Sequence, residues 1–286
     1  MRHRILSIAA GILLLCSAAG AQDFKPFFFI QLTDPQMGMY ASDGNYEQET
    51  ANLEFAVATA NRLKPAFVIV TGDLVNKAGD PVQIGEYLRI AARLNPAIKM
   101  YHVAGNHDVG NVPTPDSLRT YRAFFGPDYY SYRVENVAFF VLNSTLIHSP
   151  QGAPEEYQKQ ESWLKGELEK AKAGGAERFI IIQHHPWFLE KVDEADKYEN
   201  IPTERRRMYL ELFKQYGVTY LFSGHTHRNQ QARYGAMELV ISGPIGKPLG
   251  KDPSGMRIVK VRAKDIGHQY IDLGNLPHAV DPAKEP

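Results

Sequence analysis

Short apolar segments alternate with segments of helical periodicity in the first third of the chain, and this order most constrains the fold. Residues 27–33, 67–71 and 98–103 are largely apolar and have the length of buried strands. Apolar side chains recur at helical spacing from Leu53 to Leu63, and Pro65 stops that helix. A second helix is expected over 82–94. The resulting β-α-β-α-β order predicts a mostly parallel, buried sheet.

The remainder of the chain continues this pattern. One helix is expected through Leu164 and Leu168 up to Gly174-Gly175, and another is expected to be capped by Thr203 and ended by Gly217. A hairpin is expected around residues 135–136. Further strands are expected at 137–142, 179–183, 218–222, 237–241, 256–261 and 266–271.

The segment 111–130 interrupts this regularity. It contains several prolines and tyrosines together with Arg119 and Arg122. Because such a segment is too irregular for a core, we expect a lid or a substrate-facing insertion.

The first 21 residues have the layout of a secretory signal peptide. A basic stretch, Arg2 to Arg4, precedes an apolar run from Ile5 to Cys16, and small residues stand before an expected cleavage after Ala21. A membrane anchor is the first alternative, but a span needs about 20 apolar residues and the run from Ile5 to Cys16 is shorter. A lipoprotein site at Cys16 is the second alternative. Leu15 disfavours it, because signal peptidase II prefers a small residue directly before the cysteine. We therefore expect a periplasmic or secreted protein without a membrane anchor after cleavage.

Composition limits the mature chain further. Cys16 is the only cysteine, so cleavage leaves no thiolate for catalysis or metal binding. The formal net charge is +0 and no long basic run occurs, so no nucleic-acid surface is expected. We expect one domain over 24–275 and a loose tail over 276–286, where apolar residues are few.

Five polar motifs follow the predicted strands in order. They are Asp34-Pro35-Gln36, Gly72-Asp73, Gly105-Asn106-His107-Asp108, His184-His185-Pro186 and Gly224-His225-Thr226-His227. Strand ends of an α/β sheet converge on one edge, where such folds place their chemistry. Carboxylate, amide and imidazole donors gathered there can hold two divalent cations, which can activate a water and clamp a phosphoryl group. The motifs therefore predict a binuclear metallophosphoesterase.

The residue types predict a role for each position. Asp73 is the expected bridging ligand, because a carboxylate has an oxygen for each metal. Asp34 and His227 are expected to complete the first metal site. Asn106, His184 and His225 are assigned to the second; His184 is preferred over its neighbour His185.

His107 is adjacent to a predicted ligand and is the expected general acid for the leaving alkoxide. The alternative is a structural histidine. Asp108 and Asn76 are expected to orient imidazoles.

The chain resembles the calcineurin-like metallophosphoesterase superfamily, and within it the calcineurin-like phosphoesterase domain-containing protein 1 group. The resemblance rests on the stretches Gln31–Gln36, Phe125–Tyr130, Gly224–Asn229 and Leu249–Gly255. It implies a four-layer α/β sandwich of two mixed sheets flanked by helices. It also implies two transition-metal ions (Mn, Fe or Zn) and hydrolysis of phosphomonoesters, either small molecules or Ser/Thr phosphoproteins.

Two positions depart from the superfamily pattern. The usual Asp-x-His is Asp34-Pro35-Gln36 here, so the expected ligand Gln36 offers only a neutral carbonyl oxygen. Asn76 stands where Ser/Thr phosphatases have an aspartate paired with the catalytic histidine. Two other functions stay open: a phosphodiesterase acting on cyclic nucleotides, nucleotides or glycerophosphodiesters, and a metal-binding protein that has lost catalysis.

Overall fold

The structure is a computed structural model that describes residues 24–285. The predicted signal peptide lies outside these residues. Within them, no helix is long and apolar enough to cross a membrane.

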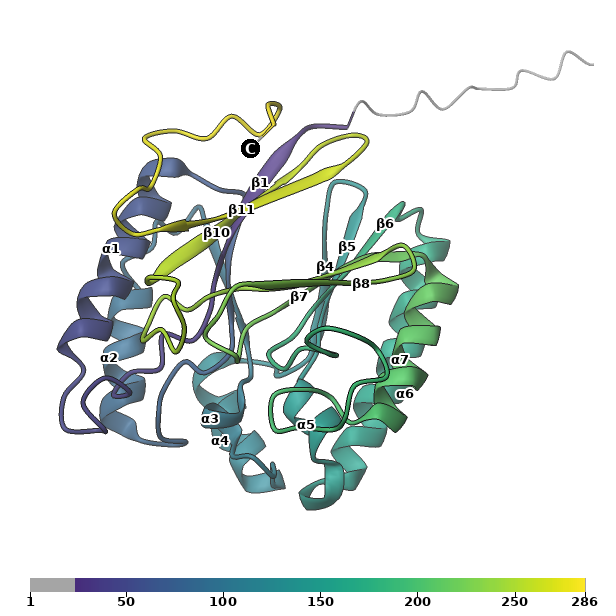
Figure 1. Cartoon of the computed structure of the whole chain (residues 1–286), viewed down its shortest axis with the longest axis horizontal. Coiled ribbons are helices and arrows are strands. Elements are labelled where there is room, and N and C mark those ends of the chain that lie inside the picture. Colours follow the sequence, from purple (N-terminus) through teal and green to yellow (C-terminus); the bar gives the residue numbers. More distant parts are fainter. Residues whose placement is uncertain (1–23, 286) are drawn as a thin grey trace, which may run out of the picture.

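Two mixed β-sheets lie face to face between two layers of helices (Figure 1). The first sheet has the order β11 (Ile266–Asp272), β10 (Gly255–Val261), β1 (Phe27–Leu32), β2 (Phe67–Thr71), β3 (Lys99–Val103). The second has the order β4 (Tyr130–Val134), β5 (Val137–Val141), β6 (Arg178–Ile182), β7 (Val218–Ser223), β9 (Met237–Ile241), β8 (Gln230–Tyr234). The central pairs β1–β2, β2–β3 and β6–β7 are parallel, so their carboxyl ends point to the same edge of the sandwich.

Helices cover both outer faces and the edge where the central strands end. They are α1 (Glu47–Leu63), α2 (Pro81–Ala91), α3 (Asn106–Val109), α4 (Pro115–Phe125), α5 (Ser144–His148), the 3-10 turn η1 (Pro150–Gly152), α6 (Pro154–Ala173) and α7 (Thr203–Tyr216). The α1 and α2 helices pack on the first sheet, and α6 and α7 lie on the far side of the second (Figure 1). The predicted four-layer α/β sandwich is confirmed.

Aromatic side chains fill the space between the sheets. Phe29 and Phe67 of the first sheet stack with ring centroids 4.7 Å apart, and Phe139 of the second sheet meets both rings edge-on. All three are at most 1% exposed. Fully burying such a side chain contributes about 1.5–3 kcal/mol. This inner core holds the two sheets together.

The segment 111–130 was expected to be irregular, but its residues Pro115–Phe125 form the helix α4, so the expected irregularity was wrong. Its role as a lid or substrate-facing insertion stays a prediction. Thr114 caps the helix by accepting from the Ser117 amide, and proline occupies its first turn. Arg122 pairs with Asp128 at 2.6 Å, and Arg119 with Asp116. Arg122 also pairs with Glu156 of α6 at 2.6 Å, so it ties this segment to the helix layer of the second sheet.

One smaller prediction was wrong, and the sequence pattern also missed some elements. Thr203 does not cap α7: it is the first helical residue, and its hydroxyl donates to Asp196 at 2.6 Å. The polar edge strand β8 and the short helix α5 were not predicted.

The tail after residue 275 has no helix or strand, yet it makes defined contacts. Leu276 and Val280 pack, partly buried, against the core beside α1. The Arg62 guanidinium donates to the carbonyls of Pro277 and His278, both at 2.7 Å. These contacts were not expected from the sequence. The groups that accept from Arg62 are backbone carbonyls, which every residue has and which give no sequence signal.

Candidate metal centre

The strand ends bring six of the predicted ligands to one edge of the sandwich. The first sheet contributes three side chains, which follow β1, β2 and β3: Asp34, Asp73 and Asn106. The second contributes three that follow β6 and β7: His184, His225 and His227. All six are buried. The centre is therefore assembled from both sheets.

The backbone at these positions is unusual. Nine non-glycine residues in the described part of the chain have positive φ, and five of them are predicted ligands with φ between 41° and 73°: Asp34, Gln36, Asp73, His225 and His227. Side chains other than glycine rarely occupy this region, and each instance costs on the order of 1–3 kcal/mol. The sharp turns after β1, β2 and β7 thus aim the side chains at a common point at the expense of local strain.

Two glycines let the turns approach each other. A Cβ at Gly72, where φ is +90°, would collide with the His184 ring. A Cβ at Gly224 would collide with the Thr33 hydroxyl and the Asp34 carboxylate. The glycines that precede Asp73 and His225 are therefore required by the close packing of the centre itself.

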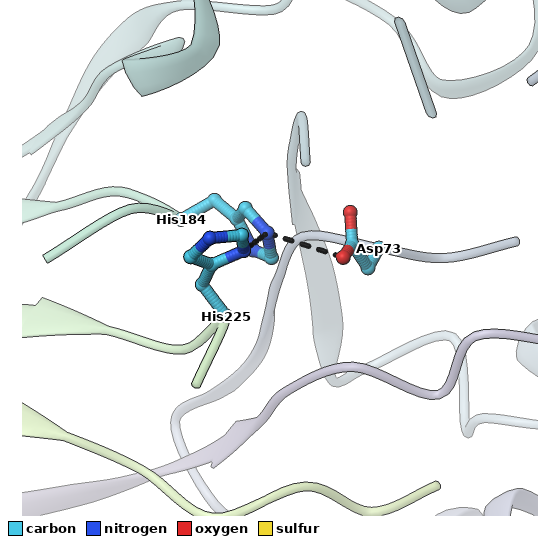
Figure 2. Close-up of side chains that lie close together, drawn as sticks. All are labelled: Asp73, His184 and His225. Atoms are coloured by element: carbon cyan, nitrogen blue, oxygen red, sulfur yellow. Dashed lines mark hydrogen bonds and ion pairs between the residues drawn. The ribbon is translucent and has the colours of Figure 1, made fainter. Parts of the chain in front are cut away.

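One cluster of donors surrounds His184 Nε2. This nitrogen lies 3.2 Å from Asp73 Oδ2, 3.1 Å from His225 Nδ1 and 3.1 Å from Asn106 Oδ1. Figure 2 shows the two imidazoles next to each other, with the Asp73 carboxylate beside His184; the ring planes are inclined at 68°. Asp73, His184 and His225 are placed closely enough to share one metal ion.

A second cluster shares the same aspartate. Asp34, Asp73 and His227 also bring one ligand atom each to within 4.8 Å of one another. His227 Nε2 faces Asp34 Oδ1 at 3.6 Å. Asp73 belongs to both clusters, and its second oxygen accepts from the His107 amide at 2.9 Å.

All three imidazoles are oriented by backbone carbonyls. His184 Nδ1 donates to Thr71 at 2.9 Å, His227 Nδ1 to Lys247 at 2.5 Å, and His225 Nε2 to Tyr198 at 3.3 Å. A carbonyl oxygen can only accept, so these nitrogens carry the protons. The other nitrogen of each ring points into the donor clusters, where it can bind a metal ion, and this is the usual arrangement of metal-binding histidines.

Burial and neighbouring charges shift the pKa values of the side chains in the centre. Burial lowers the pKa of His184, but the Asp73 carboxylate raises it to about 9. Burial would raise the pKa of Asp73, yet the His184 charge and hydrogen bond bring it well below its ordinary value. Burial also raises the pKa of Asp34, and burial next to His184 lowers the pKa of His225 to about 3. The Asp73 carboxylate and the His184 imidazole therefore stabilise each other in their charged forms.

Divalent cations fit this donor set. Mixed carboxylate, amide and imidazole donors suit Zn, Mn and Fe, and the site contains no thiolate. His184 Nε2 and His225 Nδ1 confront each other with their partner nitrogens already engaged by carbonyls. A cation among these atoms would satisfy both lone pairs and compensate the buried carboxylates.

Gln36 is held near the same turns. Its amide nitrogen donates to the Asn76 side chain at 3.1 Å, and its backbone N–H donates to the Asp73 carbonyl at 2.8 Å. Its carbonyl oxygen Oε1 is buried and has no hydrogen-bond partner in the described chain. A buried acceptor without a donor is consistent with the predicted role as a weak metal ligand.

His107 follows Asn106 directly in the chain and is half-buried. Its Nδ1 donates to the Asn76 backbone carbonyl at 2.7 Å, so Nε2 is the nitrogen available for proton transfer. Asn76 thus orients His107, as predicted, but through its backbone; its side chain binds Gln36 and Asp43.

Asp108 orients no imidazole, contrary to prediction. Its carboxylate accepts from the amides of Leu74, Val75 and Gly105, and so ties the turn after β2 to the start of α3. Burial, together with the Asp73 charge, raises the pKa of Asp108 to about 8.

Two contacts of the centre were missed by sequence reasoning. The Asn106 amide donates to Asn111 Oδ1 at 2.9 Å and to the Tyr198 hydroxyl at 2.8 Å. Neither residue belongs to a recognisable motif. Asn111 is near Asn106 in the chain, but Tyr198 is 92 residues away and no sequence signal connects the two.

Comparison with known proteins agrees with this geometry. Residues 29–229 match the family model of the calcineurin-like phosphoesterases. The human serine/threonine-protein phosphatase CPPED1 is 38% identical over 267 residues, covering 88% of this chain and 85% of the human protein. The zebrafish (Danio rerio) CPPED1 is 35% identical over 88% of this chain and 86% of its own.

Solved structures share the fold. A dimetal phosphatase from Danio rerio superposes with a TM-score of 0.62 at 14% identity, covering 86% of this chain and 96% of that one. A purple acid phosphatase from yellow lupin (Lupinus luteus) also has a TM-score of 0.62 at 14% identity, covering 89% of this chain and 52% of its own. The family match and the identity to CPPED1 assign the chemistry. The chain belongs to the calcineurin-like phosphoesterase family and is a metal-dependent phosphoric ester hydrolase.

Proposed function

We propose that the chain is a binuclear phosphomonoesterase. The observation that carries this proposal is the position of Asp73, whose carboxylate belongs to two donor clusters at once. Asp34, Asp73 and His227, with Gln36 as a weak fourth donor, would hold one ion. Asp73, Asn106, His184 and His225 would hold the other.

Two bound ions supply Lewis acidity, which activates a water and stabilises charge on the transferred phosphoryl group. The chain's own residues position the ligands, neutralise the charge of the ions and supply a proton. The carbonyl-anchored imidazoles keep their free nitrogens in place, and the buried carboxylates neutralise the positive charge. His107, with Nε2 free, donates a proton to the leaving oxygen.

We propose phosphomonoesters, phosphoserine and phosphothreonine among them, as the substrate class. The relatives named serine/threonine-protein phosphatase support this choice, because the identity extends over 88% of the chain. A phosphorylated side chain has to reach the centre from solvent, and His107 beside the proposed ligand Asn106 is only half-buried.

The test combines metal analysis with a substrate panel. Purified protein should contain two transition-metal ions per chain and should hydrolyse an aryl phosphate and a phosphothreonine peptide faster than a bis-aryl phosphate. Asp73→Asn should lose both ions and the activity, because a neutral amide bridges two cations poorly. Asp116→Asn, on the exposed start of α4, is the matched control and should retain both.

Each alternative predicts a different result. One ion per chain, or full activity in Asp73→Asn, would contradict the binuclear proposal. Faster hydrolysis of the diester would identify a phosphodiesterase. Two bound ions without any hydrolysis would indicate a metal-binding protein.

We further propose that the protein is exported and acts in the periplasm or outside the cell. The support is the basic and apolar sequence of residues 2–16, followed by Ala19-Gly20-Ala21. Intact-mass analysis of the protein expressed in a bacterial host should give a chain that begins at Gln22. A mature protein that retains Met1 to Ala21 in the cell interior would refute export.

A further inference from the structure

Tyr198 contacts two proposed metal ligands that come from different sheets. It lies in the loop of residues 186–202, which joins β6 to α7. Its hydroxyl accepts from Asn106 Nδ2 at 2.8 Å, and its backbone carbonyl accepts from His225 Nε2 at 3.3 Å. Its ring also packs against the His225 ring, with centroids 5.0 Å apart.

The contact with Asn106 determines which end of the amide faces the centre. An asparagine side chain has two N–H donors and one carbonyl acceptor. Here the nitrogen donates to Asn111 Oδ1 and to the Tyr198 hydroxyl, so both donors are used. The carbonyl Oδ1 is thereby turned toward His184 Nε2, 3.1 Å away, on the side of the shared cluster.

The contact with His225 fixes a tautomer. Because the Tyr198 carbonyl holds the proton on Nε2, Nδ1 is left as the donor that faces the cluster. One residue therefore sets the orientation of an amide ligand and of an imidazole ligand.

The loop that carries Tyr198 is well anchored. The Glu194 carboxylate accepts from the amides of Leu189 and Glu190 and from the Asn200 side chain, at 2.7–2.9 Å. The fully buried Arg206 of α7 donates to the carbonyls of Val192 and Glu194. Tyr198 itself is 51% exposed, so burial does not explain its fixed position.

We propose that Tyr198 is a positioning residue for the metal centre, whose hydroxyl acts through the Asn106 amide. Its backbone carbonyl, which a change of side chain leaves in place, holds the His225 imidazole. This inference rests on the proposed function, because it treats Asn106 and His225 as ligands. Loss of a partner that orients a ligand typically reduces metal affinity or activity by about 10–100-fold.

The test is Tyr198→Phe, which removes only the hydroxyl. Tyr216→Phe is the matched control, since Tyr216 lies at the end of α7 and contacts Glu169 at 3.5 Å. Metal-loaded wild type and both variants are mixed with a chelating dye that reports metal release. Thermal midpoints are measured with and without metal, and kcat and KM are measured on an aryl phosphate.

We expect Tyr198→Phe to release the metal held by Asn106 and His225 at least about tenfold faster than wild type. It should lower kcat with little change in KM, and its metal-free thermal midpoint should match that of wild type. Tyr216→Phe should behave as wild type throughout.

Three results would overturn the inference. Release kinetics like those of wild type would mean that the hydroxyl orients nothing. A raised KM with unchanged metal release would make Tyr198 a substrate contact. An equal drop in thermal midpoint with and without metal would make its role merely structural. Failure of the wild type to bind metal would refute the proposed function instead.

Discussion

His107 follows the proposed ligand Asn106, and its own nitrogens lie outside both donor clusters. Nδ1 is engaged by the Asn76 carbonyl, so Nε2 is free for proton transfer. His107→Ala should lower kcat by roughly 10²–10⁴-fold on alkyl phosphates, whose leaving groups need a proton. The loss should be smaller on nitrophenyl phosphate, which leaves as a stable anion. Steady-state kinetics on both substrates provide the measurement.

Metal content supplies the control for this variant. Alanine keeps the backbone N–H that donates to Asp73 Oδ1, so two ions per chain should remain. Equal losses on both substrates would point to phosphate binding instead of proton donation. A lost ion would show that the roles of His107 and Asn106 had been exchanged.

Gln36 is the weakest proposed ligand, since it offers one neutral oxygen where relatives in the wider superfamily have an imidazole. Its Oε1 is buried without a partner, and its φ of 41° places it on the strained turn after β1. Gln36→His should slow the loss of metal to a chelator severalfold, because imidazole binds Zn, Mn or Fe more strongly than an amide does. Unchanged or faster loss would show that this side chain does not reach the ion.

The 186–202 loop carries Tyr198 and is tied together by the Glu194 carboxylate. Burial raises the pKa of Glu194, but hydrogen bonds from the amides of Glu190 and Leu189 bring it below its ordinary value of 4.5. A carboxyl whose folded pKa is lowered stabilises the fold above its unfolded pKa, and this contribution is lost as the pH falls through the folded pKa.

Glu194→Gln should therefore lower the thermal midpoint near neutral pH and less so in acid. Glutamine keeps one acceptor but loses the charge that strengthens the three amide hydrogen bonds. The difference from wild type, measured by thermal scans between pH 3 and 7, should shrink below about pH 4.5. A difference that is constant with pH would assign the effect to packing.

Some strands and helices could be predicted from the sequence and others could not. The strands β1, β2 and β6 are almost entirely apolar because both of their faces are buried, and that pattern is directly readable. The edge strand β8 is half-exposed and polar, so it has no such pattern. The α4 helix buries only Leu118 and Tyr121, too few for a helical period, although Thr114-Pro115 is a legible start signal.

At the scale of the whole molecule, the sequence predicted which side chains converge but not what orients them. Strand-end motifs fix the positions of Asp34, Asp73, His184 and His225, because parallel strands end at one edge. Their orienting partners are mostly backbone carbonyls, such as those of Thr71 and Lys247, which every residue possesses. Only tertiary structure selects them.

Since the centre takes ligands from both sheets, metal binding should stabilise the entire sandwich. Each ion that binds only the folded chain at about 100 times its Kd adds about 2.7 kcal/mol, or roughly 5–10 °C in Tm for a protein of this size. We expect removal of metal by a chelator to lower the Tm by this amount for each ion lost and readdition to restore it. Asp73→Asn is the control: without the shared carboxylate, its Tm should not respond to metal. A Tm of the wild type that is independent of metal would mean that the ions do not bridge the sheets.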